Sequence, residues 1–488
     1  MEKVKKQYGL WTGIAMVVGI VIGSGVFIKS GKVLLQTGGD LKLSILAWLV
    51  GGIIMICSGF CFAVYATKVS KYNGVVDYVE HATNKKIGYG LAWLITTFYY
   101  PIIASIVALF AGKYFFELIG LGETCHIASW QNYLFAFGVL VITCVINYYS
   151  PVIAGKFQVS ATVIKLLPII VIAVVGLFAS LFIDGAPGII EAFTDPCKVF
   201  LSDHDGNALT PPINIVANNF GEAVKVTAFA YEGWVCATAI NAELKDSKKN
   251  LPRALVFGTI AVLVFYIIYF IGLSAILGNK GLLEAGNGET APMAAFAAIM
   301  GNVGSKIFTA FIVISCLGTV NGLAISCCRG MYTMSCRGQG PAPEKFSKLG
   351  KNQSVSFLSC LYGFGCMVLM LIVWYLVMNT NSVFNYLGSM DEILCAIIYG
   401  VYILMYIYIM KNFKDCNIFQ RFIMPIIAII GAAFFVLCGT GIYQLIASGF
   451  QNWESIKAFG VFMVFFVILM APCLFFYRED KHKEVSEN

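Results

Sequence analysis

The chain has 488 residues, of which 59% are hydrophobic and 12% are charged. A water-soluble globular protein carries about a quarter of its residues as Asp, Glu, Lys and Arg, so this composition excludes that class. The formal net charge of +7 does not indicate a nucleic-acid partner, because the basic residues fall in short segments between long apolar runs.

Apolar segments long enough to span a bilayer recur from residue 10 to residue 477. A membrane helix needs about 20 apolar residues to cross roughly 30 Å of hydrocarbon. The pattern predicts an all-α integral membrane protein with about twelve transmembrane helices and no sizeable soluble domain. The expected spans are residues 10–36, 43–67, 88–119, 133–151, 157–183, 217–241, 251–278, 303–334, 355–378, 383–409, 421–446 and 456–477.

The distribution of Lys and Arg predicts the orientation of the chain in the plasma (cell) membrane. If both termini are cytoplasmic, the cytoplasmic segments hold most of the basic residues. The outer segments then hold only Lys29, Lys32, Lys42, Lys198, Lys280 and Lys457. By the positive-inside rule, this bias predicts a multi-pass protein with cytoplasmic N and C termini. The longest outer segment, 184–216, is expected to be a loop between two halves.

The first expected span contains the stretch GIVIGSGVFIKSG, from Gly19 to Gly31. Three central residues, Gly23, Ser24 and Gly25, allow the backbone to unwind inside the membrane. Unwinding frees N–H groups that suit a carboxylate and carbonyl groups that suit an ammonium ion, and a free amino acid offers both. The alternative is close helix packing through small residues.

A second interruption lies in the expected span 217–241, within KVTAFAYEGWVCATAI. Glu232 and Gly233 break an otherwise apolar run there. Paired interruptions in corresponding segments indicate a midplane binding site in transporters built from inverted repeats. Phe229, Tyr231 and Trp234 would then wall the pocket, although aromatic residues in membrane helices are also common as packing residues or interface anchors.

Two ionisable residues inside the spans are candidates for coupling. Lys165 lies roughly mid-depth in the span 157–183, with no acidic residue nearby in the sequence. It either snorkels to the interface or points into the bundle, where it could donate to carbonyls of the unwound first helix or release a proton. Glu232 could exchange a proton or bind the substrate's amine; alternatively, it caps the outer half of its helix from the first turn.

The remaining reactive residues do not indicate an enzyme or a cofactor. The chain has 16 cysteines, but none has the spacing of a zinc site, and those inside spans read as small buried hydrophobes. The histidines lie far apart in the sequence, at His81, His126, His204 and His482. We find no phosphate-binding loop or hydrolase triad, and therefore expect neither catalysis nor a metal or cofactor.

Several motifs occur together in a characteristic order. They are GSGVF at the first break, PIIASIVALFAGKYF in the third span, FAYEGW at the second break, NAELKDSKKNLPRAL after it, and CCRGMYTMSCRGQGPAPEKF at the end of the eighth span. Together they resemble the amino acid–polyamine–organocation superfamily. Within it, the chain is similar to the L-type amino acid transporters, the light chains of heteromeric exchangers, and specifically to a bacterial-type member.

This resemblance implies a LeuT-type fold of two inverted five-helix repeats, 10–183 and 217–409, plus two further helices in 421–477. It implies that the substrate carboxylate meets the amides at the first break and that the amine meets nearby carbonyls. The implied substrate-binding residues are Val21, Ile22, Gly23, Ser24, Gly25, Phe229, Ala230 and Tyr231. The resemblance also implies that Lys165 replaces the sodium ion of sodium-dependent relatives.

The chain departs from the light-chain pattern at several positions. Light chains commonly have glycine where this chain has Glu232 and asparagine where it has Val235, which affects the expected substrate range and coupling. The resemblance places Cys125 near the loop cysteine through which animal light chains bond a heavy-chain glycoprotein. Fifteen other cysteines, and bacterial relatives that act alone, disfavour that partner.

The sequence therefore predicts a sodium-independent exchanger of neutral L-amino acids that works by alternating access in the lipid bilayer. The alternatives are a proton-coupled amino acid symporter and a cationic amino acid or polyamine antiporter. A channel is disfavoured because paired helix breaks are not a pore lining, and a membrane enzyme because no acid or histidine cluster forms at one membrane face.

Overall fold

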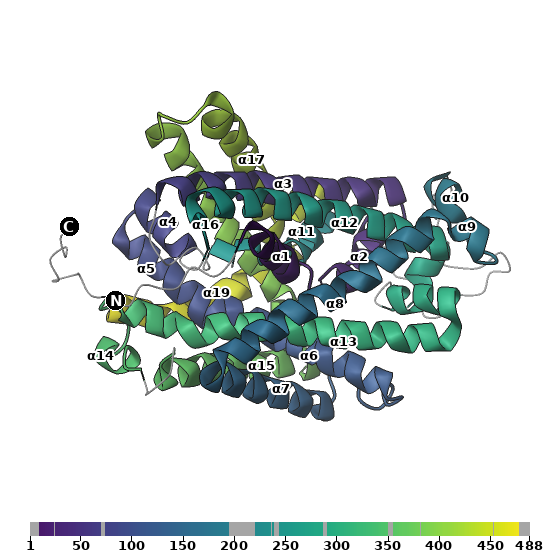
Figure 1. Ribbon diagram of the computed structural model, residues 1–488, viewed down its shortest axis with the longest axis horizontal. Helices are drawn as coiled ribbons and strands as arrows, with labels where there is room; N and C mark the ends of the chain where they lie inside the picture. Colours follow the sequence, from purple (N-terminus) through teal and green to yellow (C-terminus); the bar gives the residue numbers. More distant parts are fainter. Residues whose placement is uncertain are drawn as a thin grey trace.

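The computed structural model describes residues 9–23, 25–69, 74–194, 220–235, 237–238, 244–285, 290–349, 355–380, 382–451 and 453–477. Within these ranges the protein is a bundle of helices without a β-strand, so the all-α prediction is confirmed (Figure 1). Ten helices there are long and apolar enough to cross a membrane, and a bent pair at the N-terminal side makes up to eleven.

The long helices largely follow the expected spans. They are α3 (Leu41–Lys68), α5 (Lys85–Leu94) continued by α6 (Tyr100–Leu118), α7 (Trp130–Tyr149), α8 (Pro151–Leu177), α12 (Ser247–Glu284), α13 (Ala291–Ser335), α15 (Phe357–Asn379), α16 (Met390–Asn412), α17 (Met424–Gly439) and α19 (Glu454–Phe476). Short helices connect them: α4 (Val75–Ala82), α9 (Ala179–Phe182), α10 (Gly188–Thr194), α14 (Pro343–Phe346) and α18 (Ile442–Ala447).

Both predicted interruptions are present. The first span is divided into α1 (Leu10–Val21) and α2 (Gly25–Gln36), and the segments Gly13–Phe27 and Lys29–Gln36 within it are bent by 59° relative to each other. In the second, α11 (Phe220–Ala230) ends where the sequence predicted the break. Residues 217–219, 236 and 239–241 of that expected span lie outside the described part of the chain.

Some boundaries differ from the expected ones. The expected helix 157–183 begins earlier, as α8, and its last residues form the separate helix α9. The expected loop 184–216 contains α10, while residues 195–216 lie outside the described ranges. α12 extends beyond the expected end 278 because it continues after a kink at Gly278, and α13 begins before the expected start 303 because a helical segment precedes its kink at Met300–Gly301. Gly278 and Gly301 adopt positive φ angles, which glycine tolerates.

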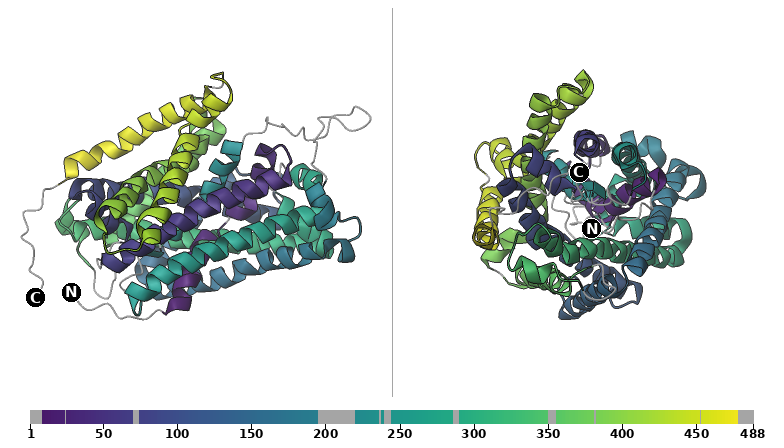
Figure 2. Two further views of the ribbon diagram at one scale, coloured as in Figure 1. Left: turned by 90° about the horizontal axis from the view of Figure 1, so that it is seen from above. Right: turned by 60° about the vertical axis from the view of Figure 1, so that its left-hand side comes forward.

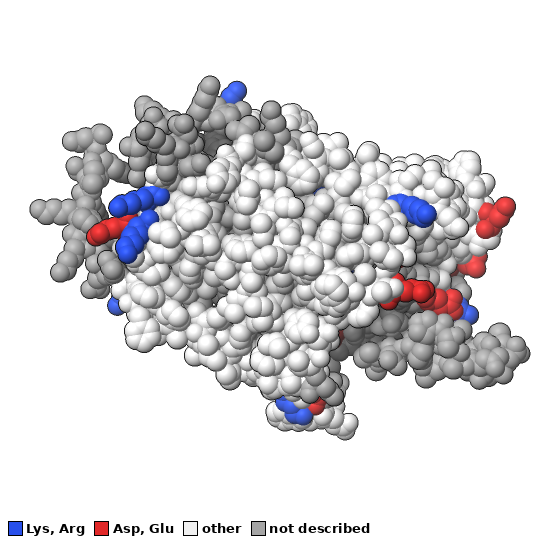
Figure 3. All heavy atoms as spheres, turned by 90° about the horizontal axis from the view of Figure 1, so that it is seen from below, with Lys and Arg blue, Asp and Glu red and all other residues white. Residues whose placement is uncertain are grey.

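The surface agrees with a position in a bilayer. Many large apolar side chains on the long helices are exposed, including Ile142, Ile430 and Val464. On the face shown in Figure 3, charged side chains gather mainly toward the two ends of the long axis and leave a broad uncharged area between them. α19 lies along one edge of the bundle (Figure 2), whereas α1, α2 and α11 lie inside it (Figure 1). The protein is therefore a multi-pass membrane protein.

Candidate functional site

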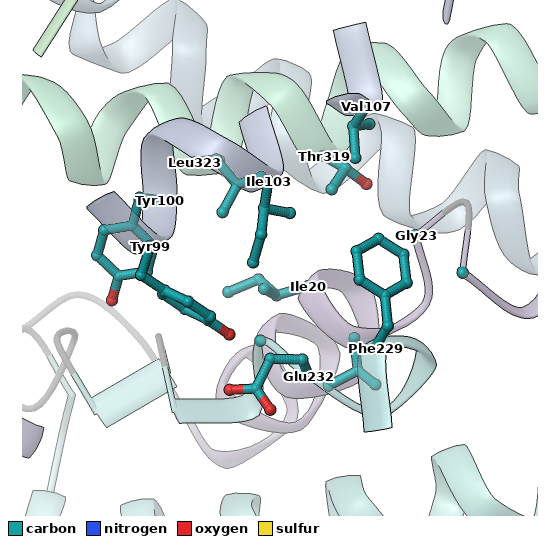
Figure 4. A pocket seen from close by; sticks show the side chains of 14 residues that line it. Ile20, Gly23, Tyr99, Tyr100, Ile103, Val107, Phe229, Glu232, Thr319 and Leu323 are labelled. Atoms are coloured by element: carbon teal, nitrogen blue, oxygen red, sulfur yellow. The ribbon is translucent and has the colours of Figure 1, made fainter. Parts of the chain in front are cut away.

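A cavity of about 60 Å³ lies where the two helix breaks meet (Figure 4). It is lined by Ile20, Val21, Gly23, Gly25, Tyr99, Tyr100, Ile103, Val107, Phe229, Glu232, Gly233, Thr319, Gly322 and Leu323. These residues come from the breaks after α1 and α11, from α6 with the turn before it, and from α13. The structure thus brings the two predicted interruptions together at one buried site.

The first break is a tight turn between α1 and α2. Ile22 leaves helical geometry with a ψ of 82°, and the Gly23 amide donates to the Val21 carbonyl at 2.7 Å. The predicted residue Ser24 lies outside the described residues. α2 begins at Gly25, and the first N–H groups of a helix have no acceptor within that helix. With the positive end of the helix dipole, they suit a carboxylate group.

The second break follows the last residue of α11, Ala230. Gly233 has a φ of 100°, a left-handed conformation that side-chain-bearing residues rarely adopt. The carbonyls at the end of α11 carry the negative end of its dipole and suit an ammonium group. The two breaks therefore present opposite partial charges to the same cavity.

The two breaks are also in direct contact. A Cβ atom added to Gly25 would lie 2.8 Å from the Cα atom of Ala230. The Tyr266 hydroxyl from α12 lies 3.0 Å from the Val21 carbonyl and 3.0 Å from the Ala230 carbonyl, and it can donate to one of them at a time. The backbone carbonyls of Val21 and Ala230, two residues that the resemblance places at the substrate, are therefore each within hydrogen-bonding distance of the Tyr266 hydroxyl.

Glu232 is buried beside the cavity, 7% exposed. It follows the C-terminal end of α11, so the alternative that it caps that helix from the first turn is wrong. Its carboxylate points toward the Tyr99 hydroxyl (Figure 4). Glu232 Oε2 and the Tyr99 hydroxyl make no hydrogen bond of normal geometry in the part of the chain that the structure describes, although Glu232 lies close enough to interact with Tyr99 and with the Gly233 backbone. The site therefore contains unused polar groups that face the space for a ligand.

Lys165 is fully buried in α8, so the alternative that it snorkels to the surface is wrong. A Cβ atom on Gly19 would lie 2.3 Å from Thr162, which shows that α8 packs tightly against α1. Lys165 follows Thr162 by about one turn and has Cys316 of α13 as a neighbour. Its ammonium group has no hydrogen-bond partner among the described residues, and it does not line the cavity.

Not all predicted pocket residues face the cavity. The Tyr231 hydroxyl donates to the backbone carbonyl of Trp48 at 2.9 Å, and Trp234 packs on Phe62 with ring centroids 4.8 Å apart. Ile22 and Ala230 do not line the cavity. The prediction that Tyr231 and Trp234 wall the pocket is therefore wrong, while Phe229 does line it.

Sequence reasoning missed Tyr99, Tyr100 and Thr319. The two tyrosines lie at the junction of the π-helical turn η1 (Ile95–Tyr99) and α6, directly before Pro101. π-Turns inside helices occur frequently at functional sites, so the sequence FYYP was an available signal. Thr319 is brought to the site by α13, where a Cβ atom on Gly23 would lie 3.0 Å from its hydroxyl oxygen.

A buried charged cluster lies beside the site, and we call its members Lys29, Glu222, Lys225, Asp391 and Glu392 the Lys29 cluster. Lys29 Nζ donates to Glu392 Oε1 at 2.7 Å, and Lys225 Nζ lies 2.6 Å from Glu222 Oε2 and 3.6 Å from Glu392 Oε2. Lys29 also lies 4.7 Å from the centroid of the Phe229 ring, which lines the cavity. The sequence placed Lys29 in an outer segment, but it is buried within α2.

These features first define a class. A bundle of membrane helices in which two interrupted helices enclose a buried cavity has the architecture of a secondary transporter. The chain belongs to the amino acid permease family, because the model of that family, described as "Amino acid permease", matches residues 8–471.

Similar proteins agree with this assignment. The chain is 29% identical to the serine/threonine exchanger SteT of Bacillus subtilis (strain 168), over 91% of this chain and 93% of that protein. It is 26% identical to the large neutral amino acids transporter small subunit 2 of Homo sapiens, over 78% of this chain and 68% of that protein. It is 23% identical to the cystine/glutamate transporter of Homo sapiens, over 70% of this chain and 63% of that protein. The protein is an amino acid transporter and not an enzyme, and the resemblance found in the sequence is confirmed.

Proposed function

We propose that this protein exchanges neutral L-amino acids across the cell membrane without sodium, by alternating access, with both termini cytoplasmic. The observation that carries the proposal is the meeting of the N-terminal end of α2 and the C-terminal end of α11 at one cavity. Helix ends of opposite partial charge match the carboxylate and ammonium groups of an amino acid. A relative named an exchanger supports antiport.

In this proposal the substrate carboxylate binds the amides that open α2, at Gly25 and the residues before it. The ammonium group binds carbonyls at the end of α11, near Phe229 and Ala230. Lys165 donates to carbonyls of the first break during the cycle and thereby supplies the positive charge that a sodium ion would otherwise provide. The predicted halves 10–183 and 217–409 would be the two inverted repeats, followed by the two helices in 421–477.

We also propose that the protein works without a heavy-chain glycoprotein. Cys125, the residue that the resemblance places near the linking cysteine, is 6% exposed between α6 and α7. A buried thiol is not presented to a partner protein, and an intermolecular disulfide requires exposed sulfur.

Proton-coupled symport is the second candidate. Glu232 and Lys165 are ionisable and buried, and Glu232 Oε2 and the Lys165 ammonium group lack a hydrogen-bond partner among the described groups, as expected for residues that bind and release protons. The Glu232 carboxylate would also suit a cationic amino acid or a polyamine.

Counterflow in liposomes distinguishes these functions. Purified protein is reconstituted with unlabelled amino acid inside, and uptake of labelled L-serine, L-leucine and L-arginine is measured with sodium, with choline in its place, and with a pH gradient. We expect uptake of the neutral amino acids that requires internal amino acid and is equal in sodium and choline. Accumulation driven by the pH gradient with empty liposomes would establish the symporter, and uptake of arginine alone would establish a cationic substrate.

A further inference from the structure

A groove of about 550 Å³ lies between α7 and α8, on the side of α13 that faces away from the substrate cavity. α7 contributes Phe135, Gly138 and Ile142, α8 contributes Phe157, and α13 forms the floor with Leu317 and Asn321. The proposed transport mechanism does not use this groove.

The groove and the substrate cavity share one segment of α13. Leu317 and Asn321 line the groove, whereas Thr319, Gly322 and Leu323 line the cavity. At about 100° per residue, these two groups lie on opposite faces of the helix. Any molecule bound in the groove therefore packs against the face of α13 that is opposite the cavity at the two helix breaks.

The polar side chains of the groove are already engaged. Asn147 Nδ2 donates to Asn321 Oδ1 at 3.1 Å, and the Thr143 hydroxyl donates to the Val139 carbonyl at 2.9 Å. A buried water needs two to four polar partners, and a zwitterionic amino acid needs charged ones. The rest of the lining is hydrocarbon or aromatic, so neither water nor the transported substrate matches this surface.

The groove opens sideways at the depth of the bilayer's hydrocarbon. Ile142 and Phe157 at its rim are 58% and 40% exposed. Ile142 lies roughly 18 Å from the start of α7 and roughly 10 Å from its end, at 1.5 Å per residue. The adjoining faces of α7 and α8 are also exposed and apolar, at Leu134 and Val163. Lipid tails, and not headgroups, reach this depth.

We propose that this groove is a binding site for the acyl chain of a membrane phospholipid. An apolar space of this size left empty would forfeit the dispersion contacts of its lining, and an inserted hydrocarbon chain restores them. The bound chain fills the space between α7 and α8 and supports the segment of α13 behind the substrate cavity.

Gly138 makes the site testable. A Cβ atom on Gly138 meets no atom within 4 Å, so Gly138→Trp places an indole in the groove without a clash at Cβ. Gly365 in α15 is the matched control, because a Cβ atom there also meets nothing within 4 Å, and the residue is exposed and does not line the groove. Both variants and the unaltered protein are reconstituted with a phospholipid that carries a photoreactive diazirine on one acyl chain, and adducts are located by peptide mass spectrometry.

We expect the unaltered protein and Gly365→Trp to carry adducts on Leu317, which lines the groove, as well as on the exposed residues Ile430 and Val464. Gly138→Trp should lose the adduct on Leu317 and keep the other two. The mass of the adduct on Leu317 must correspond to the intact phospholipid. If the mass corresponds to a free fatty acid, the occupant of the groove is not a phospholipid and the proposal is overturned. Absence of label on Leu317 in the unaltered protein, or its persistence in Gly138→Trp, would overturn the site even if exchange itself is normal.

Discussion

At the scale of single residues, the most informative feature is a pair of buried ionisable side chains, each with a polar atom that lacks a hydrogen-bond partner in the described structure. Lys165 is 0% exposed and Glu232 is 7% exposed, and both lie in the membrane interior. Ionisable groups at such positions are costly to bury and commonly mark substrate or ion pathways. The two residues lie on different helices, α8 and the break after α11, so their roles can be tested separately.

The first prediction concerns Lys165. Lys165→Ala should lower amino acid exchange by about tenfold or more, because losing one hydrogen bond from a charged group costs about 1.5–3 kcal/mol. Exchange is measured as counterflow in liposomes. Lys306→Ala, at an exposed position of α13, is the control and should exchange normally. Normal exchange by Lys165→Ala would remove the proposal that this lysine stands in for sodium.

The second prediction separates exchange from proton coupling at Glu232. Glu232→Gln keeps the size and shape of the side chain, but it cannot ionise and it replaces one acceptor oxygen with an NH2 donor. If the protein is an exchanger, counterflow of neutral amino acids by this variant should remain within about threefold of the unaltered protein, a difference under 1 kcal/mol. If counterflow persists but pH-driven accumulation disappears relative to the unaltered protein, Glu232 is instead a proton carrier and the symporter is the better description.

At the scale of elements, the interrupted helices are specified by contacts that only glycine permits. α2 and α11 approach so closely at Gly25 that an added methyl group would meet the backbone of Ala230 at 2.8 Å. Backbone cannot move aside as a flexible side chain does, so the two helix ends would have to separate. In the proposed site, the partial charges that the two helix ends offer to one substrate molecule depend on this approach.

The third prediction follows from that contact. Gly25→Ala should weaken substrate binding strongly and abolish most exchange, because it displaces α2 from α11. Gly365→Ala, where a Cβ atom meets open space, is the control for the general effect of replacing glycine in a membrane helix. Substrate binding is measured by calorimetry on the purified proteins. Equal affinity in Gly25→Ala and the unaltered protein would show that the approach of the helix ends is not required.

At the scale of the whole molecule, ionic clusters join segments that are far apart in the chain. The Lys29 cluster connects α2, α11 and α16, and Gln444 of α18 donates to Glu222 at 2.6 Å. Elsewhere, Arg337 after α13 pairs with Asp77 and Glu80 of α4. Four of the five members of the Lys29 cluster are buried, and Glu222 is partly buried, so removal of one member leaves opposite charges without full compensation.

The fourth prediction tests the Lys29 cluster. Lys29→Met should destabilise the protein by about 3–5 kcal/mol, the cost of breaking a buried ion pair by removing one partner. The double variant Lys29→Met with Glu392→Gln should lose less stability than the sum of the two single variants. Thermal unfolding in detergent provides the measurement. Lys457→Met, which removes an exposed partner of Glu454, should leave the unfolding midpoint nearly unchanged, and strict additivity at Lys29 and Glu392 would contradict a direct interaction.

Much of the fold and part of the site could be predicted from the sequence. The positions of most spans and both helix breaks followed from hydropathy and from the residues Gly23, Gly25 and Gly233. Boundaries were less predictable, because α12 and α13 continue beyond kinks at Gly278 and Gly301 that end the strongest apolar runs. Which side chains line the cavity was also not predictable from the sequence, as Tyr231 and Tyr99 show. Both are tyrosines beside an irregular turn, and only Tyr99 faces the cavity.

The sequence by itself determined that this protein lies in a membrane, where its helices are interrupted and to which family it belongs. Those properties depend on local composition, on backbone freedom at individual glycines and on motifs read along the chain. The tertiary structure decided which side chains face the cavity at the two helix breaks, that Lys29 is buried among acidic partners, and that a lipid-facing groove lies behind that cavity. These properties depend on neighbours hundreds of residues away, such as Glu392 for Lys29, and no local pattern contains that information.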